Sequence, residues 1–226
     1  MAAKSDRMAR GLSGGDATRP DVLHDDAWWL VAVKPAGLLS VPGRGDDKQD
    51  CLATRLQAIY PDALVVHRLD MATSGLWLMA RGLAMQRRLA RAFEQRQVHK
   101  RYEAVVAGTP SGTSGEIALP LAADWPNRPR QQVDHVHGKP SLTRWQVLGP
   151  GPLPGTTRLA LEPVTGRSHQ LRVHLLAIGH PIVGDALYAP PDVATAAPRL
   201  WLHASELQLA HPGTGESMHW TSAAPF

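Results

Sequence analysis

A charged loop between two apolar segments is the feature that most constrains this chain. Residues 64–66 and 76–80 are short apolar runs bounded by turn-forming residues, a pattern that predicts two strands. Between them lie Arg68, the carboxylate of Asp70 and the small-residue turn Thr73-Ser74-Gly75. Loops held by a rigid scaffold often carry catalytic groups. The pattern therefore makes Asp70 a candidate for a catalytic role, on a loop that two strands hold in place.

The rest of the chain predicts more strands than helices. Further strands are expected at residues 28–33, 98–106, 145–148, 158–162, 199–203 and 206–210. Helical periodicity predicts a helix from the N-cap Asp50 to Pro61, a second around residues 85–93, and a third over 170–178 with Ser168 as its N-cap. Because strands and helices do not alternate regularly, we predict an α+β fold.

The two ends of the chain differ in composition. Residues 1–20 are polar and contain several glycines, so we predict a flexible N-terminal tail there. No hinge-like linker divides residues 21–226, which are long enough to bury a core without disulfides or metals. We therefore predict one catalytic domain over residues 21–226.

Cysteine content and hydropathy indicate where the protein functions. The one cysteine, Cys51, cannot form an intramolecular disulfide, which favours a reducing compartment. No apolar run approaches the roughly 20 residues that a membrane helix needs, and no secretion signal is evident. We predict a cytoplasmic protein, with an organelle transit peptide as the alternative. The net charge of +4 suits a polyanionic partner, although an ordinary basic surface explains it equally well.

Three segments along the chain combine reactive side chains with small turns. They are residues 67–76 (HRLDMATSGL), residues 100–108 (KRYEAVVAG), and residues 165–175 (TGRSHQLRVHL) followed by 179–185 (GHPIVGD). In order and spacing they resemble the motifs of the RluA-type pseudouridine synthases. The resemblance implies the fold of that family: a mixed, mostly antiparallel central sheet flanked by helices and loops around a catalytic cleft. It also implies conversion of uridine to pseudouridine in RNA, without a preceding S4-type RNA-binding domain.

The implied reaction detaches uracil from its ribose, turns it and rejoins it through carbon. Nothing is oxidised and no group is imported, so we expect no cofactor and no metal. A carboxylate can hold one fragment covalently while the other turns, and the resemblance gives that role to Asp70. Attack on the sugar and attack on the base ring both remain open. The alternative for Asp70 is a structural ion pair within its loop.

Two further residues, Arg167 and Tyr102, are candidates for the catalytic site. By resemblance, Arg167 would pair with Asp70, since a nearby guanidinium orients a carboxylate in a site that excludes water; a phosphate contact or a surface arginine is the alternative. Tyr102 would stack on the uracil, and its hydroxyl could move the ring proton. The alternative is a half-buried strand tyrosine.

Several further residues are candidates for substrate binding. By resemblance, Arg68 enters the space that the flipped uridine leaves, with a surface arginine as the alternative. Leu171 is expected to pack against Tyr102, although an ordinary core leucine is nearly as good an interpretation. Candidate phosphate contacts, each with a solvated charge as the alternative, are Arg44, Arg87, Arg88, Arg128 and Arg130.

Two segments carry a narrower likeness, to the family members that act on both tRNA and 23S rRNA. They are residues 37–44 (GLLSVPGR) and 124–129 (DWPNRP). The likeness implies uridine 32 of the tRNA anticodon loop and uridine 746 of 23S rRNA as targets, with RNA stem-loops as the partners of a monomeric enzyme. The alternatives are the same chemistry on a different uridine, and a non-catalytic RNA-binding chaperone.

Overall fold

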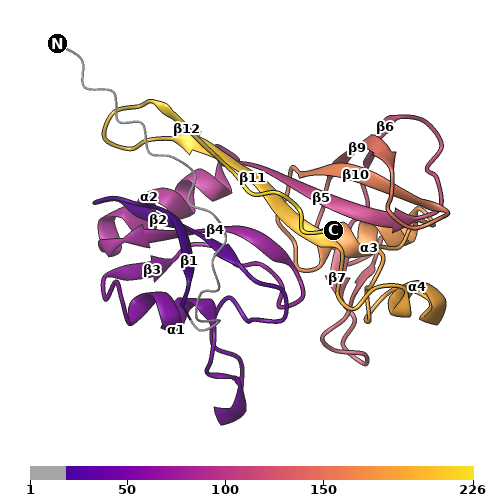
Figure 1. Ribbon diagram of the computed structural model, residues 1–226, viewed down its shortest axis with the longest axis horizontal. Helices are drawn as coiled ribbons and strands as arrows, with labels where there is room; N and C mark the ends of the chain where they lie inside the picture. The colour runs from indigo at the N-terminus through magenta and orange to yellow at the C-terminus, as the bar shows by residue number, and fades with distance from the viewer. Residues whose placement is uncertain (1–18) are drawn as a thin grey trace.

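One long twisted sheet runs through the part of the chain that the computed structural model describes, residues 19–226 (Figure 1). Within these residues the sheet has ten strands in the order β1-β2-β4-β11-β5-β10-β9-β6, with β3 paired to β4 and β12 paired to β11. The strands are β1 Asp21–Asp25, β2 Trp29–Lys34, β3 Ala63–Val65, β4 Ser74–Arg81, β5 His99–Ala107, β6 Ser114–Ile117, β9 Thr143–Pro150, β10 Thr156–Pro163, β11 Leu202–Ala210 and β12 Ser217–Thr221.

The sheet is mixed but mostly antiparallel. Among its paired strands only β4 and β11 run parallel, through His203 opposite Ser74 and Ala204 opposite Gly75. A separate hairpin, β7 Leu121–Ala123 and β8 Gln131–Val133, carries the loop 124–130. The helical segments are η1 Asp46–Lys48, α1 Leu52–Gln57, α2 Gly82–Glu94, α3 Gln170–Ala177 and α4 Pro191–Thr195. The predicted α+β class is confirmed.

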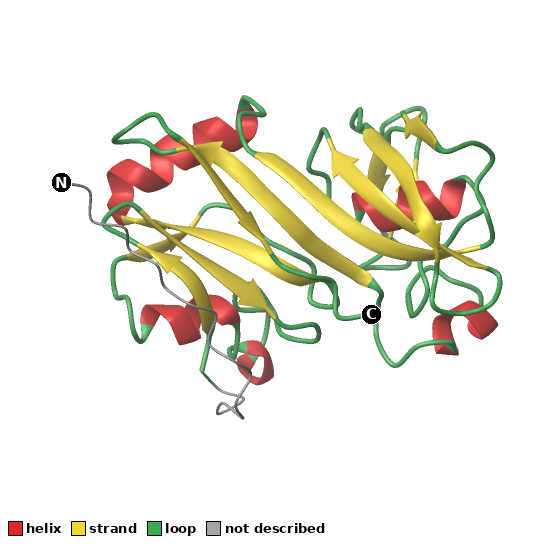
Figure 2. Ribbon diagram, turned by 45° about the horizontal axis from the view of Figure 1, so that its top comes forward, coloured by secondary structure: helices red, strands yellow, loops and turns green. Residues whose placement is uncertain are grey.

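The sheet joins two halves of the molecule. Strands β1 to β4 lie with α1 and α2 in one half, whereas β6 to β10 lie with α3 and α4 in the other (Figure 1). The long strands β5 and β11 extend across both halves (Figure 2). Tyr102 on β5 packs against two apolar clusters, one that contains Leu69 and one that contains Leu171. A side chain at this position faces the boundary between the halves.

The predicted elements are present, with local shifts at their ends. The N-cap of α1 is Cys51, whose thiol and Thr54 form a reciprocal capping box, while Asp50 pairs with Arg55 at 2.6 Å. The N-cap of α3 is His169, not Ser168. The two strands predicted over residues 199–203 and 206–210 are one strand, β11, since its pairing with β5 continues through a bulge between Ala204 and Glu206.

Two predictions concern regions outside these elements. The tail predicted over residues 1–20 lies outside the described residues except for Arg19 and Pro20, and β1 begins at Asp21. Between residues 19 and 226, no helix has both the length and the apolar character that crossing a membrane requires.

Gly75 is expected to tolerate no side chain. Its φ of +113° is one that L side chains rarely adopt, and a Cβ there would lie closer than 3.0 Å to the backbone of Ala204 in β11. We predict that Gly75→Ala lowers the free energy of unfolding by about 3 kcal/mol or more, measured by urea denaturation. The control is Gly82→Ala, where φ is +75° but nothing lies within 4 Å. It should cost only about 1–2 kcal/mol. Equal losses would contradict the close-approach explanation.

Candidate active site

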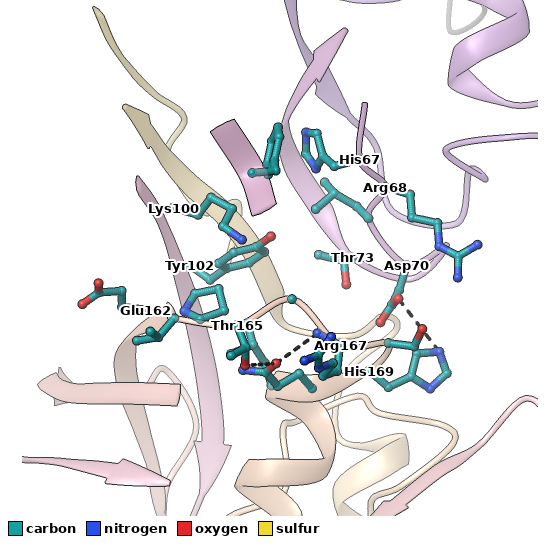
Figure 3. A pocket seen from close by; sticks show the side chains of 18 of the residues that line it. His67, Arg68, Asp70, Thr73, Lys100, Tyr102, Glu162, Thr165, Arg167 and His169 are labelled. Carbon is teal, nitrogen blue, oxygen red and sulfur yellow. Dashed lines mark hydrogen bonds and ion pairs between the residues drawn. The ribbon is translucent and has the colours of Figure 1, made fainter. Parts of the chain in front are cut away.

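A cleft of about 800 Å³ opens where the two halves meet (Figure 3). Its walls include three segments distant in sequence: the loop after β3 with Arg68 and Asp70, the start of β5 with Tyr102, and the segment between β10 and α3 with Arg167. This volume lies within the range of roughly 300–1,000 Å³ that is usual for small-molecule sites. The fold therefore brings the three motif segments to one cavity.

The segment after β2 holds one side of the Asp70 loop. Nζ of the fully buried Lys34 donates to the carbonyl oxygens of Pro35, Leu38 and Met71, at 2.8, 2.7 and 3.0 Å. Ser40 Oγ donates to the carbonyl of Leu69 at 2.8 Å and lies 3.0 Å from its amide nitrogen. Burial lowers the pKa of Lys34 to about 7, although the charge of Asp70 opposes that shift. The backbone on both sides of Asp70 is thus fixed by buried hydrogen bonds.

The start of the same loop is held by His67. Its Nε2 accepts the amide hydrogen of Leu78 at 3.1 Å, and its carbonyl accepts from Trp77 Nε1 at 3.0 Å. The imidazole stacks on Phe93 with ring centroids 4.6 Å apart. Burial lowers the pKa of His67 to about 3, so the ring is neutral at physiological pH, as an accepting Nε2 requires. His67 supports the loop and carries no charge toward the cleft.

Two cationic or polar side chains face the carboxylate of Asp70. Nη1 of Arg172 lies 3.6 Å from Asp70 Oδ2, and Nε2 of His169 lies 3.9 Å from Oδ1. Asp70 remains 27% exposed, whereas Arg172 is only 4% exposed. The carboxylate is therefore accessible from the cleft while its guanidinium partner is enclosed by protein. Such a partner orients a carboxylate and stabilises its negative charge.

The guanidinium of Arg172 is itself held in place. Its Nε and Nη2 donate to the two carboxylate oxygens of Asp185, at 2.8 and 2.6 Å, which leaves Nη1 directed at Asp70. Asp185 is 1% exposed and also accepts the amide hydrogens of Leu187 and Tyr188. This planar, two-point pair is specific to arginine. Burial alone would lower the pKa of Arg172, but the carboxylates of Asp185 and Asp70 raise it above its usual value.

The predicted pairing of Arg167 with Asp70 is wrong. Arg167 lies in the exposed turn before α3, where its Nε donates to the carbonyl of Pro140 at 3.3 Å and its amide donates to Gln170 Oε1 at 3.0 Å. It lines the cleft, but the arginine that faces Asp70 is Arg172. The physical reason is that Arg172 sits on a buried face of α3, where packing aims its side chain, whereas Arg167 precedes the helix.

Tyr102 lines another wall of the cleft (Figure 3), and it packs against the apolar cluster that contains Leu171 of α3. Burial raises the pKa of Tyr102, and the charge of Asp70 raises it further. The phenol is therefore protonated at neutral pH and can donate a hydrogen bond, but it is not a ready base. Its ring offers a face on which a base could stack.

The predicted substrate-binding arginines occupy different places. Arg68 is exposed and lines the cleft, on the opposite side of the chain from the buried Leu69, as the alternation predicted. Arg128 and Arg130 lie on the exposed loop 124–130, where the Arg128 guanidinium carbon lies 3.3 Å from the ring centroid of Trp125. Outside the lining of the cleft are Arg44, Arg87, Arg88, Arg128 and Arg130.

Sequence reasoning missed Arg172 and His169, which face Asp70, and Asp185 and Tyr188, which hydrogen-bond to those two residues. Arg172 follows Arg167 by five positions in the same motif, and only the start of α3 at Gln170 separates the buried arginine from the exposed one. Asp185 and Tyr188 stand after the glycine of the segment 179–185, three residues apart. The available signal was that these polar residues stand among apolar ones, but this pattern does not indicate which residues they contact.

Comparisons with known proteins agree with this geometry. A family model described as RNA pseudouridylate synthase matches residues 29–177, a range that contains Asp70, Tyr102 and Arg172. The chain is 50% identical over 205 residues (91% of this chain, 93% of the relative) to the dual-specificity RNA pseudouridine synthase RluA of Escherichia coli O6:H1. It is 50% identical over 200 residues (88% and 79%) to the protein of the same name from Vibrio cholerae serotype O1.

A solved structure is also similar. Human RNA pseudouridylate synthase domain containing 1 superposes with a TM-score of 0.78 at 28% identity, covering 95% of this chain and 87% of that one. The similarity therefore extends over both halves of the sheet and over the cleft between them.

Proposed function

Because this chain belongs to the RNA pseudouridylate synthase family and is of the RluA type, we propose that Asp70 in its cleft is the nucleophile that converts uridine to pseudouridine in RNA stem-loops. The observation that carries the proposal is the position of Asp70: a partly exposed carboxylate at the cleft, on a loop fixed from both sides, facing the buried guanidinium of Arg172. The cleft that the fold presents is then the active site.

The reaction we propose balances without a cofactor. The target uridine leaves its stack and enters the cleft, and the carboxylate of Asp70 forms a covalent bond with one part of it. The bond from C1′ to N1 breaks, the uracil turns, and a bond from C1′ to C5 forms. Asp70 is then released, C5 loses its hydrogen to solvent and N1 gains one. Nothing is oxidised or reduced.

We propose roles for three other residues from their positions. We propose that Tyr102 stacks on the uracil, because its ring lines the cleft, and that its protonated hydroxyl donates to the base. Arg172 stabilises the charge of Asp70 from the buried side. We propose that Arg68, which is exposed and lines the cleft, enters the stack that the flipped base has left.

The substrates we propose are those implied by the likeness to dual-specificity relatives: uridine 32 of the tRNA anticodon loop and uridine 746 of 23S rRNA. Single-stranded loops suit this cleft, since their bases can be splayed out and stacked on an aromatic side chain. We further propose that residues 21–226 form one catalytic domain. The monomeric state and the cytoplasmic location stay predictions, and light scattering on the purified protein tests the first.

Pseudouridine mapping tests the proposal most directly. Purified protein is incubated with transcribed tRNA and with a 23S rRNA fragment, and the modified positions are read from each RNA. We expect conversion at one uridine in each loop. Conversion at other positions would show that the target uridines are different ones. Binding of RNA without any conversion would refute the enzymatic function and favour a non-catalytic RNA-binding chaperone.

RNA binding is expected to weaken as salt is added, because each phosphate contact releases counterions. Arg128 and Arg130 lie on an exposed loop and are proposed to contribute such contacts. Arg128→Gln should lower the slope of log affinity against log salt by about one, measured by fluorescence anisotropy on an anticodon stem-loop. The control is Arg19→Gln, because Arg19 precedes β1 in the other half of the molecule, and this change should leave the slope unaltered. A slope unchanged by Arg128→Gln would remove Arg128 from the interface.

A further inference from the structure

Tyr188 contacts His169 and Arg172, the two side chains that face Asp70, but it does not line the cleft itself. It follows the buried Asp185 and is only 6% exposed. Two guanidinium groups lie near its ring: the carbon of Arg172 is 4.9 Å from the ring centroid, and that of Arg130, from the loop 124–130, is 5.4 Å away. Contacts of this kind restrict where a guanidinium can lie. The side chain thus joins the base of the loop to the partner of Asp70.

The hydroxyl of Tyr188 makes two short hydrogen bonds. It accepts the amide hydrogen of Gln131, the first residue of β8, at 2.8 Å, and it lies 2.6 Å from Nδ1 of His169. Among the described residues, Nδ1 of His169 is the acceptor available for the hydroxyl hydrogen. Donation to Nδ1 places the imidazole hydrogen on Nε2. That nitrogen is the one facing Asp70, 3.9 Å from Oδ1.

His169 has a backbone conformation that needs support. Its φ of 53° and ψ of 18° lie in the left-handed region, which non-glycine residues seldom adopt and which clusters at functional sites. Burial lowers the pKa of His169, against the opposing charge of Asp70, so the ring is neutral and Nδ1 can accept. The hydrogen bond from Tyr188 is therefore consistent with the charge state of the imidazole and fixes the orientation of its ring.

We infer that Tyr188 is a positioning residue, which holds His169 as the Nε2–H tautomer and Arg172 in line with Asp70, and ties both to the base of the loop 124–130. The inference rests on the proposed function, because it assigns Tyr188 a role in aligning the nucleophile. Tyr188 acts through residues that touch the cleft and does not touch the substrate. Alignment errors of about 1 Å at a reacting centre can lower a rate on the order of a hundred-fold.

The kinetic test compares two tyrosine-to-phenylalanine changes. Tyr188→Phe keeps the ring near the guanidinium groups of Arg130 and Arg172 but removes the two hydrogen bonds of the hydroxyl group. We expect kcat to fall about ten-fold or more, with KM for the RNA changed less than about two-fold. Tyr60→Phe is the matched control, since Tyr60 Oη donates to Asp25 at 2.7 Å outside the cleft, and it should leave both constants unchanged. An unchanged kcat in active Tyr188→Phe enzyme would overturn the inference.

A spectroscopic test needs no turnover. Two-bond nitrogen–proton correlation spectra of the histidine-labelled, unaltered chain report which nitrogen of each ring carries hydrogen, and His169→Gln identifies the signal. We expect the Nε2–H tautomer for His169, with mixed tautomers in Tyr188→Phe. The Nδ1–H tautomer in the unaltered chain would overturn the inference.

The two failures are distinguishable. An unaltered chain without activity on any RNA would sink the proposed function, even if His169 showed the expected tautomer. An active chain whose Tyr188→Phe variant keeps its kcat and its His169 tautomer would sink only the inference.

Discussion

Asp70→Asn is expected to abolish pseudouridine formation while leaving RNA binding almost intact. The amide has nearly the same size as the carboxylate but is a poor nucleophile, so the covalent step cannot begin. We expect turnover to fall by at least about 10³-fold. The measurement is release of tritium from uridine labelled at C5, because the reaction replaces the C5 hydrogen with a bond to C1′. Affinity for the same RNA, measured without turnover, should change by less than about ten-fold.

Two controls support this prediction. Asp192→Asn makes the same chemical change on the exposed helix α4 and should keep full activity. Asp70 is partly exposed, and Arg172 keeps its ion pair with Asp185. The free energy of unfolding of Asp70→Asn should therefore lie within about 1 kcal/mol of that of the unaltered chain. A folded Asp70→Asn enzyme with full activity would refute Asp70 as the nucleophile.

Arg172→Gln and Arg167→Gln are expected to differ sharply. Removing the Arg172 guanidinium takes away the charge that faces Asp70 and should lower kcat by about 10²-fold or more. It also leaves the buried Asp185 without its ion-pair partner, which should cost about 3 kcal/mol or more of unfolding free energy. The side chain of Arg167 is exposed and donates to the carbonyl of Pro140, so Arg167→Gln should lower kcat by less than about ten-fold and leave the free energy of unfolding almost unchanged.

The stability loss of Arg172→Gln must be separated from its kinetic effect. Urea denaturation gives the first, and kcat is measured well below the unfolding midpoint of each variant. Arg172→Lys keeps a charge but cannot make the two-point contact with Asp185, so it should recover activity only in part. A larger loss of kcat in Arg167→Gln than in Arg172→Gln would overturn Arg172 as the functional partner of Asp70.

Local patterns predicted elements better than element ends. The strand expected at residues 98–106 is β5, and the amphipathic pattern with Met85 and Leu89 inward is α2, where both side chains are buried. Ends were less predictable: Asp50 is a good N-cap by type, yet Cys51 caps α1. A cap depends on the φ and ψ that tertiary contacts impose, and one residue either way satisfies the same local pattern.

The sequence by itself determined the class of fold and three segments that line the cleft, including the one with Asp70, because these depend on hydrophobic patterning and on short motifs that resemble those of a known family. Only the tertiary structure decided which arginine faces Asp70 and that Tyr188 reaches His169, Arg172 and Gln131. Gln131 and Tyr188 are 57 positions apart, and Asp70 and Arg172 are still more widely separated in sequence. Contacts over such separations are set by how β5 and β11 register and by how α3 packs on the sheet, which no local pattern encodes.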